Sequence, residues 1–177
     1  MKIGELDFKP ITENLNLVAE PIQNEVKIGS LGSGINVVSI DPELADTATF
    51  CETYNVPRVI AANCIIVEAK RADKVWYAAC LILADDMIDV NGKVRKHLEA
   101  RKTSFAPKGI ALELTRMEYG GITPLGLPKE WSILIDKNVM TNEYAVIGGG
   151  IRGSKILADT GVLAALDHAE IIDITKS

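Results

Sequence analysis

The sequence predicts an α+β fold built around a mixed β-sheet. Two long apolar runs, 59–68 and 74–84, flank a short charged stretch, and this pattern is typical of a hairpin of buried strands. Further strand-like and helix-like segments follow without the strict alternation of a parallel α/β protein. With 177 residues, the chain has the length of one compact domain.

The chain is expected to divide at about residue 35. Residues 1–35 mix polar and apolar residues and are predicted to form an N-terminal accessory segment. The glycine- and serine-rich stretch 29–34 is expected to act as a flexible hinge. Residues 36–177 then form the main domain.

The main domain is expected to begin with a strand and a helix. Residues 35–40 form a short β-rich run. Asp41 and Pro42 follow as an N-cap and a proline in the first turn, so a helix is predicted to run to about Tyr54. The two long apolar runs come next, and because both of their faces are apolar they are expected to be central strands.

The sequence predicts a hairpin turn between these two strands and two helices after the second strand. The charged stretch 69–73 is expected to form the turn, and a helix with a mostly polar surface to span about 92–102. A second helix is predicted to start at Pro107 and to bury the apolar residues at helical spacing. That buried face would comprise Ile110, Leu114 and Met117.

The last third of the chain predicts several short elements. They are strands at 131–135, 144–147 and near 155–157, a helix capped by Asp159 and Thr160, and a possible sheet-edge strand at 171–174. Strands and helices are therefore interspersed to the end of the sequence.

Charge and composition argue against several classes of protein. The chain has 19 basic and 24 acidic residues and a net charge of −5, which disfavours a protein that coats nucleic acid by bulk charge. No apolar run reaches the ~18 residues that span a bilayer. With three separated cysteines, two distant histidines and no export signal, we expect a cytoplasmic protein without a metal or cofactor.

The first candidate binding element is the glycine-proline loop 120–128. Glycines bring bare backbone close to a ligand, prolines stiffen the loop, and exposed N–H groups suit a carbonyl oxygen or an oxyanion. A structural crossover between a helix and a strand would have the same composition. The residues singled out in this loop are Gly120, Gly121, Thr123 and Pro124.

The second candidate element is the glycine-rich loop that starts at residue 148. It has neither a phosphate-loop nor a dinucleotide-binding pattern, but its successive N–H groups could form an anion nest. A wide hairpin turn is the alternative interpretation. The candidate binding residues are Gly148, Gly149, Gly150, Arg152, Gly153, Ser154 and Lys155.

No nucleophile with its base is visible in the sequence. His97 and His168 have no assignable serine or cysteine partner, and there is no nucleophile-elbow motif. Asp136, at the end of a predicted strand, is the candidate carboxylate because it stands near both glycine loops. Its alternative role is to cap the turn that follows.

A basic stretch lies within this acidic chain. Residues 91–116 contain seven basic and two acidic residues, a net charge of +5, which leaves −10 on the rest of the chain. A solvated surface is one interpretation, and a contact with a phosphate backbone is the other. The candidate contacts are Lys93, Arg95, Lys96, Arg101 and Lys102.

Residues 114–126, Leu-Thr-Arg-Met-Glu-Tyr-Gly-Gly-Ile-Thr-Pro-Leu-Gly, resemble the signature of the YbaK/prolyl-tRNA-synthetase-associated editing domain family. The resemblance extends over about 40–173. It implies a mixed, partly barrel-like sheet flanked by helices, and an enzyme that hydrolyses the ester of a mischarged aminoacyl-tRNA. The partner would be the tRNA acceptor end, and the reaction would need only a positioned water and backbone N–H groups for the oxyanion.

The resemblance also implies roles for individual residues. The loop around Gly120 and Gly121 would line the aminoacyl pocket, and the loop from Gly148 would close its other side. The family usually has a lysine in the first long strand, where this sequence has Asn63. Asparagine can donate a hydrogen bond but brings no charge. Either Lys155 or Arg152 replaces the lysine, or activity is weakened, or the chain binds tRNA or a small aminoacyl-like ligand without catalysis.

Overall fold

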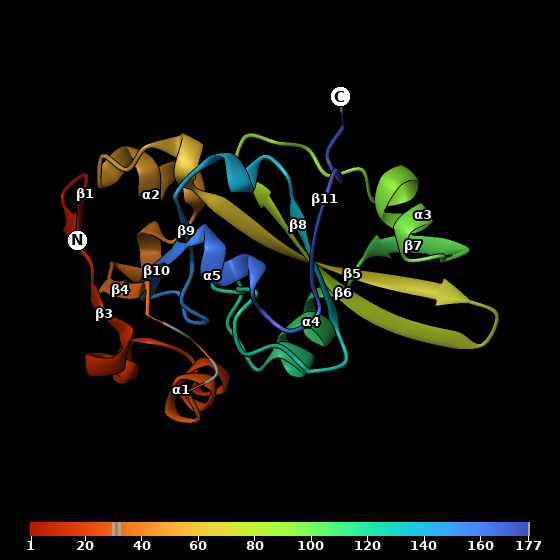
Figure 1. The fold of residues 1–177 in the computed structure, drawn as a ribbon, viewed down its shortest axis with the longest axis horizontal. Helices are drawn as coiled ribbons and strands as arrows, with labels where there is room; N and C mark the ends of the chain where they lie inside the picture. Colours follow the sequence, from red (N-terminus) through yellow and green to blue (C-terminus); the bar gives the residue numbers. More distant parts are fainter. Residues whose placement is uncertain (30, 32, 177) are drawn as a thin grey trace.

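The computed structural model describes residues 1–29, 31 and 33–176, and it shows two main β-sheets with short helices around them (Figure 1). The five-stranded sheet has the order β11-β8-β6-β5-β7, and the four-stranded sheet has the order β3-β4-β10-β9. The larger sheet consists of β5 (Ala62–Arg71), β6 (Lys74–Leu83), β7 (Lys102–Phe105), β8 (Ser132–Asp136) and β11 (Ala169–Ile172). The smaller consists of β3 (Lys9–Pro10), β4 (Ile35–Ser39), β9 (Tyr144–Gly148) and β10 (Ser154–Asp159).

The remaining elements are short. β1 (Lys2–Ile3) pairs with β2 (Leu6–Asp7) near the N-terminus. The α-helices are α1 (Glu20–Lys27), α2 (Thr47–Thr53), α3 (Arg95–His97), α4 (Lys108–Thr115) and α5 (Thr160–Ala164). Single turns of other helix types are η1 (Ile11–Glu13), η2 (Leu15–Leu17), η3 (Pro42–Leu44), η4 (Arg58–Ile60), the π-helical η5 (Val90–Val94) and η6 (Val139–Thr141).

The predicted α+β class and mixed sheet are confirmed. In the larger sheet, β8 is parallel to both β6 and β11, whereas β5 is antiparallel to β6 and β7. An isolated bridge between Ala61 and Val146 connects the segment before β5 to β9. Each of the two main sheets ends in edge strands, so the described part of the chain forms no closed barrel.

The predicted β5–β6 hairpin is present, and its turn is tighter than expected. Its register runs from Ala62 opposite Leu83 to Arg71 opposite Lys74, so the turn consists of residues 72 and 73 only. This turn lies within the predicted stretch 69–73 but is shorter, because β5 continues to Arg71 and Ala69 is fully buried in the sheet. The hairpin extends away from α2 and carries the tip to the far side of the molecule (Figure 1).

The helix predicted at 92–102 is present only in its first half. The π-turn η5 and three residues of α3 cover its first half, and β7 begins at Lys102. The helix predicted to start at Pro107 is present as α4, but its expected buried face is wrong in two positions. Ile110 and Leu114 are 37% and 39% exposed, and the helix instead buries Ala111 and Thr115.

The N-terminal residues pack against the rest of the chain. β3 pairs with β4, and Ile22 of α1 is fully buried in the same core cluster as residues of β8, β9 and β10. Ser30 and Gly32 of the predicted hinge lie outside the described residues. The division at residue 35 stays a prediction.

Most of the other predicted elements are confirmed. β4, β8, β9 and β10 lie where strands were expected, and β11 lies at the sheet edge. The Asp159 carboxylate accepts a hydrogen bond from Gly161 N at 2.7 Å, as expected for the cap of α5. No helix among the described residues is long and apolar enough to cross a membrane.

Candidate functional site

A cleft of about 580 Å³ lies where the two sheets meet. Its walls come from four parts of the chain: the start of β5, the N-terminal end of α2, the segment 119–122, and the facing ends of β9 and β10. The Ala61–Val146 bridge brings the start of β5 beside β9. The candidate residues that line the cleft are Asn63, Gly120, Gly148, Arg152 and Lys155.

The two predicted glycine loops touch through their backbones. Gly150 N donates to Gly121 O at 2.7 Å, and Glu118 N donates to Gly150 O at 2.9 Å. A Cβ at Gly148 would collide with the Gly121 carbonyl oxygen, so only glycine permits this approach. The loops therefore form one continuous wall of the cleft.

This wall carries unused hydrogen-bond donors. Within residues 1–29, 31 and 33–176, the backbone N–H groups of Gly120 and Ile122 donate no hydrogen bond. Both residues line the cleft. Two backbone donors in one segment can bind an oxygen atom that carries negative charge.

Asn63 is held in place by α2. The Thr47 hydroxyl donates to Asn63 Oδ1 at 2.8 Å, and both residues line the cleft. With its oxygen engaged, the Asn63 amide has its Nδ2 hydrogens left as donors. The asparagine is therefore oriented to donate rather than to accept a hydrogen bond in the cleft.

Lys155 brings a buried positive charge to the cleft. Its side chain is only 6% exposed, its Nζ donates to Ala45 O at 2.9 Å, and the ammonium lies 5.1 Å from the centre of the Phe50 ring. Burial lowers the pKa of Lys155 below the ordinary lysine value. Register places Lys155 directly opposite Gly148, so the charge stands beside the glycine wall.

Arg152 holds the mouth of the cleft together. Its guanidinium donates to the carbonyl oxygens of Tyr119 (3.3 Å) and Pro42 (2.9 Å), and its backbone N donates to the Glu118 carboxylate at 2.7 Å. The side chain thus connects the 119–122 segment to the start of η3. Much of its hydrogen-bonding capacity is used inside the protein.

Cys64 also lines the cleft but is a poor nucleophile. Burial, and secondarily the neighbouring Cys80, raise the pKa of its thiol far above the ordinary value. Because the thiolate is the reactive form, this cysteine stays protonated and unreactive near neutral pH. Neither His97 nor His168 lines the cleft.

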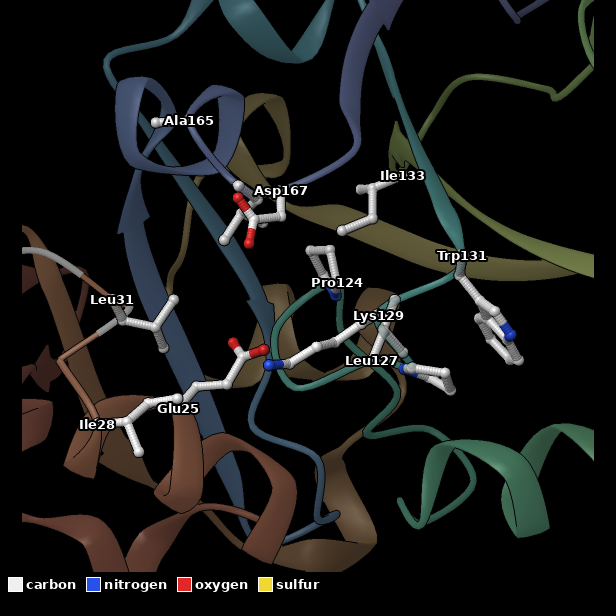
Figure 2. Close-up of a pocket in the computed structure, with 12 residues that line it drawn as sticks. Glu25, Ile28, Leu31, Pro124, Leu127, Lys129, Trp131, Ile133, Ala165 and Asp167 are labelled. Carbon is white, nitrogen blue, oxygen red and sulfur yellow. The ribbon is translucent and has the colours of Figure 1, made fainter.

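Three predicted loop residues lie behind the wall. Gly121 and Thr123 are buried and do not line the cleft, and Pro124 lines a separate cavity of about 110 Å³ beside α1 (Figure 2). In that cavity Figure 2 shows Glu25 and Lys129 pointing toward each other. A Cβ at Gly121 would come within 2.8 Å of the Ile151 backbone, so this glycine serves loop packing.

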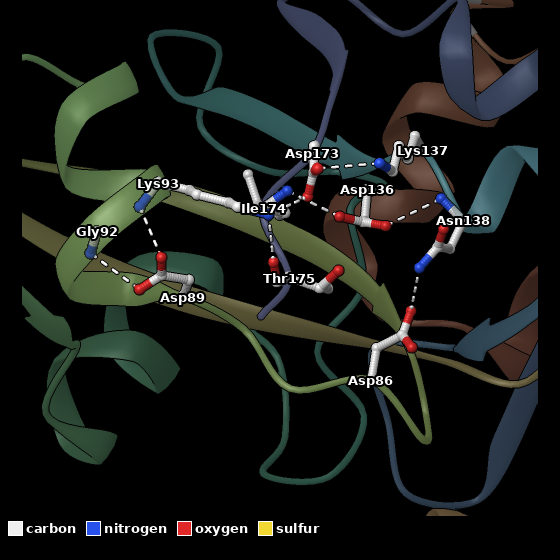
Figure 3. Close-up of polar contacts among 10 residues, drawn as sticks. All are labelled: Asp86, Asp89, Gly92, Lys93, Asp136, Lys137, Asn138, Asp173, Ile174 and Thr175. Carbon is white, nitrogen blue, oxygen red and sulfur yellow. Dashed lines mark hydrogen bonds and ion pairs between the residues drawn. The ribbon is translucent and has the colours of Figure 1, made fainter. Parts of the chain in front are cut away.

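Asp136 is separated from the cleft. Its carboxylate is fully buried and accepts hydrogen bonds from Asn138 N at 2.9 Å and from Ile174 N at 2.8 Å (Figure 3). The Asn138 bond is the turn cap that the sequence offered as the alternative role. Asp136 was expected near both glycine loops, but it does not line the cleft, because its side chain points into the β8–β11 region and accepts from Ile174 N in the segment after β11.

The second loop contributes only part of its predicted set to the cleft. Gly149, Gly150 and Ser154 are buried, and Gly153 packs near Pro42. The hydroxyls of Ser154 and Thr123 have no hydrogen-bond partner among the described residues, but neither residue lines the cleft. Of the predicted set, only Gly148, Arg152 and Lys155 line the cleft.

Three of the five predicted basic contacts line one hollow, and the other two do not line it. Lys93 Nζ is engaged with the Asp173 carboxylate at 2.6 Å and with Thr175 O at 2.7 Å (Figure 3). Lys102 begins the edge strand β7. The other three candidates, Arg95, Lys96 and Arg101, line a shared hollow near the hairpin tip.

Sequence reasoning missed several residues of the cleft. Thr47 and Arg58 had no motif to mark them, and Arg58 pairs with Asp85 at the rim. Tyr119 was within the quoted signature but was not selected. Its position directly before the glycine pair was the available signal, and its exposed ring lies 3.9 Å from Lys108 Nζ.

Comparison with known proteins agrees with this arrangement. A solved structure described as a "putative trans-editing enzyme for prolyl tRNA synthetase" superposes with a TM-score of 0.76 at 16% identity, covering 89% of this chain and 96% of that one. A hypothetical protein of known structure superposes with a TM-score of 0.76 at 18% identity, covering 89% of this chain and 100% of that one. At these identities the two structures show the fold. The profile of the aminoacyl-tRNA editing domain matches residues 41–166, and the chain belongs to this family.

Proposed function

We propose that the protein hydrolyses, in trans, the ester bond of mischarged aminoacyl-tRNA. The observation that carries the proposal is the grouping of four donors in one cleft of an editing-family domain: the Gly120 and Ile122 N–H groups, the Asn63 amide and the Lys155 ammonium. A tetrahedral oxyanion formed from an ester carbonyl needs donors of this kind.

The chemistry does not require a protein nucleophile. An aminoacyl ester is already reactive, so a positioned water can attack its carbonyl carbon while the donors stabilise the oxyanion. The C–O bond to the ribose then breaks, and the proton released by the water passes to the ribose oxygen. The protonated state of Cys64 agrees with this water-based route.

Other predicted site residues would act through the shape of the cleft. Gly121, Thr123 and Pro124 hold the 119–122 segment against the second loop, and Arg152 fixes its position relative to η3. We assign Asp136 to the stability of β8 and the segment after β11. These residues position the donors and do not contact the ester.

The structural neighbour described for prolyl-tRNA synthetase suggests the substrates to test first. We propose small amino acids esterified to tRNA, because the cleft also has to hold the terminal ribose within about 580 Å³. The experiment is a panel of tRNAs charged with alanine, cysteine, serine or proline, with ester loss measured over time. No acceleration over the spontaneous rate for any member would reject the hydrolase.

Asn63 supports one alternative, a homologue that binds without catalysis. Where the family usually has lysine, this cleft has an uncharged amide. The alternative predicts binding of aminoacyl-tRNA with no ester loss in the same panel.

A further inference from the structure

We infer that a basic groove at the β5–β6 hairpin tip binds the phosphate backbone of the acceptor helix whose aminoacyl end enters the cleft. The groove, called here the hairpin groove, is lined by Arg71, Ala72, Arg95, Lys96, Glu99, Ala100 and Arg101. Identification of the anion as tRNA rests on the proposed function. The surface itself is argued from its own geometry and charge.

The backbone of the hairpin groove is fixed. Arg71 Nη1 donates to Glu99 O at 3.1 Å, and Arg101 N donates to Lys70 O at 2.9 Å, so the hairpin tip is joined to the loop after α3. Glu99 has a φ of +52°, which reverses the chain at this point. The hollow is therefore built between two connected elements and does not depend on one mobile side chain.

The charge of the hairpin groove is only partly compensated by its one carboxylate. Four cations and one carboxylate line it, and among the described residues none of Arg71, Arg95, Lys96 and Arg101 forms an ion pair. Like charges held close together reduce stability. In a chain with a net charge of −5, such a cluster is explained by an anionic ligand, and three guanidinium groups suit phosphate oxygens.

The distance from the cleft sets the size of that ligand. Asn63 and Arg71 lie at opposite ends of the same strand, β5, eight residues apart. At ~3.3 Å per residue, the separation along the strand is about 26 Å. A single aminoacyl nucleotide is too short to occupy both places, whereas a helical RNA with an aminoacylated end can.

The test compares Arg71→Ala/Arg101→Ala with a matched variant, Lys2→Ala/Lys27→Ala, which removes two exposed cations elsewhere. The binding probe is an RNA minihelix with a single-stranded CCA end and no amino acid attached. Its affinity for each variant is measured over a salt series. Each lost phosphate contact lowers the slope of log affinity against log salt by about 0.9. For the groove variant, we expect this slope to become less steep by about 1.8 and the affinity at low salt to fall at least tenfold. The slope and affinity of the matched variant should equal those of the wild type.

A second measurement separates this inference from the proposed function. If both hold, the groove variant raises KM for an aminoacylated minihelix but hydrolyses aminoacyl-adenosine like the wild type. Groove-dependent minihelix binding without ester loss from any substrate would reject the hydrolase and retain the groove. Ester loss with an unchanged salt slope, or an equal loss in the matched variant, would overturn the groove. Groove-dependent binding to anionic phospholipid vesicles without minihelix binding would overturn it in favour of a membrane.

Discussion

Replacing Lys155 by methionine is expected to remove catalysis and leave the fold in place. Methionine has a similar length and no charge, so it can occupy the buried position of the Lys155 side chain. The substitution leaves Ala45 O without its donor at 2.9 Å, which costs about 1 kcal/mol. It also removes the cost of burying an ammonium that is only 6% exposed. The two changes oppose each other, and we expect the free energy of unfolding to change by at most about 1 kcal/mol.

The expected effect on the reaction is much larger. Loss of one positioned donor for an oxyanion typically lowers the rate by about 100-fold, which corresponds to about 2.7 kcal/mol in the activation free energy. Because the charge acts on the developing oxyanion, the loss should fall on kcat more than on KM. The assay is single-turnover hydrolysis of the aminoacyl-tRNA that the wild type cleaves fastest, together with urea unfolding of each variant.

Lys176→Met is the control, since it removes an exposed lysine that does not line the cleft. A folded Lys155→Met protein with wild-type kcat would refute the electrostatic role of Lys155. A loss of activity that matches a loss of folded protein would also refute it, because the lysine would then act on stability alone.

Four further outcomes are expected. Asn63→Lys should change activity by less than tenfold if the wild type is a hydrolase, whereas a large gain from a near-zero rate in the deacylation assay would favour the non-catalytic alternative. Asp136→Ala should lower the free energy of unfolding by about 2–4 kcal/mol in urea, because two N–H groups lose a buried acceptor, while the kcat of the folded fraction stays unchanged. Gly148→Ala should lower both the melting temperature and activity by forcing the glycine loops apart, whereas Gly109→Ala in α4, where a Cβ meets nothing within 4 Å, should raise stability by about 0.5–1 kcal/mol. The pKa of Lys155 is lowered in the folded protein, so between that pKa and the ordinary value of 10.5 the unfolded chain binds more protons than the folded chain. In this pH range the free energy of unfolding of the wild type, measured in urea, should rise with pH relative to that of Lys155→Met. The same pH dependence in both proteins would contradict the buried charge.

Local signals predicted those elements that the chain specifies over short distances. Asp159 caps α5 through its own carboxylate, and the apolar runs of β5 and β6 form a hairpin because they adjoin in sequence. β7 could not be predicted in this way. Its four residues have no strand pattern of their own and become a strand by pairing with β5.

The sequence predicted the loops that form the cleft but not which of their residues line it. Glycine content marked the segments around Gly120 and Gly148, because a close backbone approach needs residues without a side chain. The same pattern does not distinguish a glycine that faces a ligand from Gly121, which faces Ile151. Asp136 was misplaced because adjacency to a loop in sequence does not determine which side of the sheet a carboxylate meets. Only the tertiary arrangement brings Asn63 and Lys155 to the same cleft.

Two of the four donors in the cleft, the N–H groups of Gly120 and Ile122, belong to the main chain. An alanine scan cannot remove them, since every residue except proline supplies the same N–H. Such a scan would underestimate the contribution of this wall to catalysis. Ile122→Pro, or exchange of a backbone amide for an ester, is needed to delete one of these donors. The path of the backbone encodes this part of the site, so side chains along it can diverge widely as long as the touching glycines remain. Proteins of one family can then differ at most positions and still present the same pair of donors.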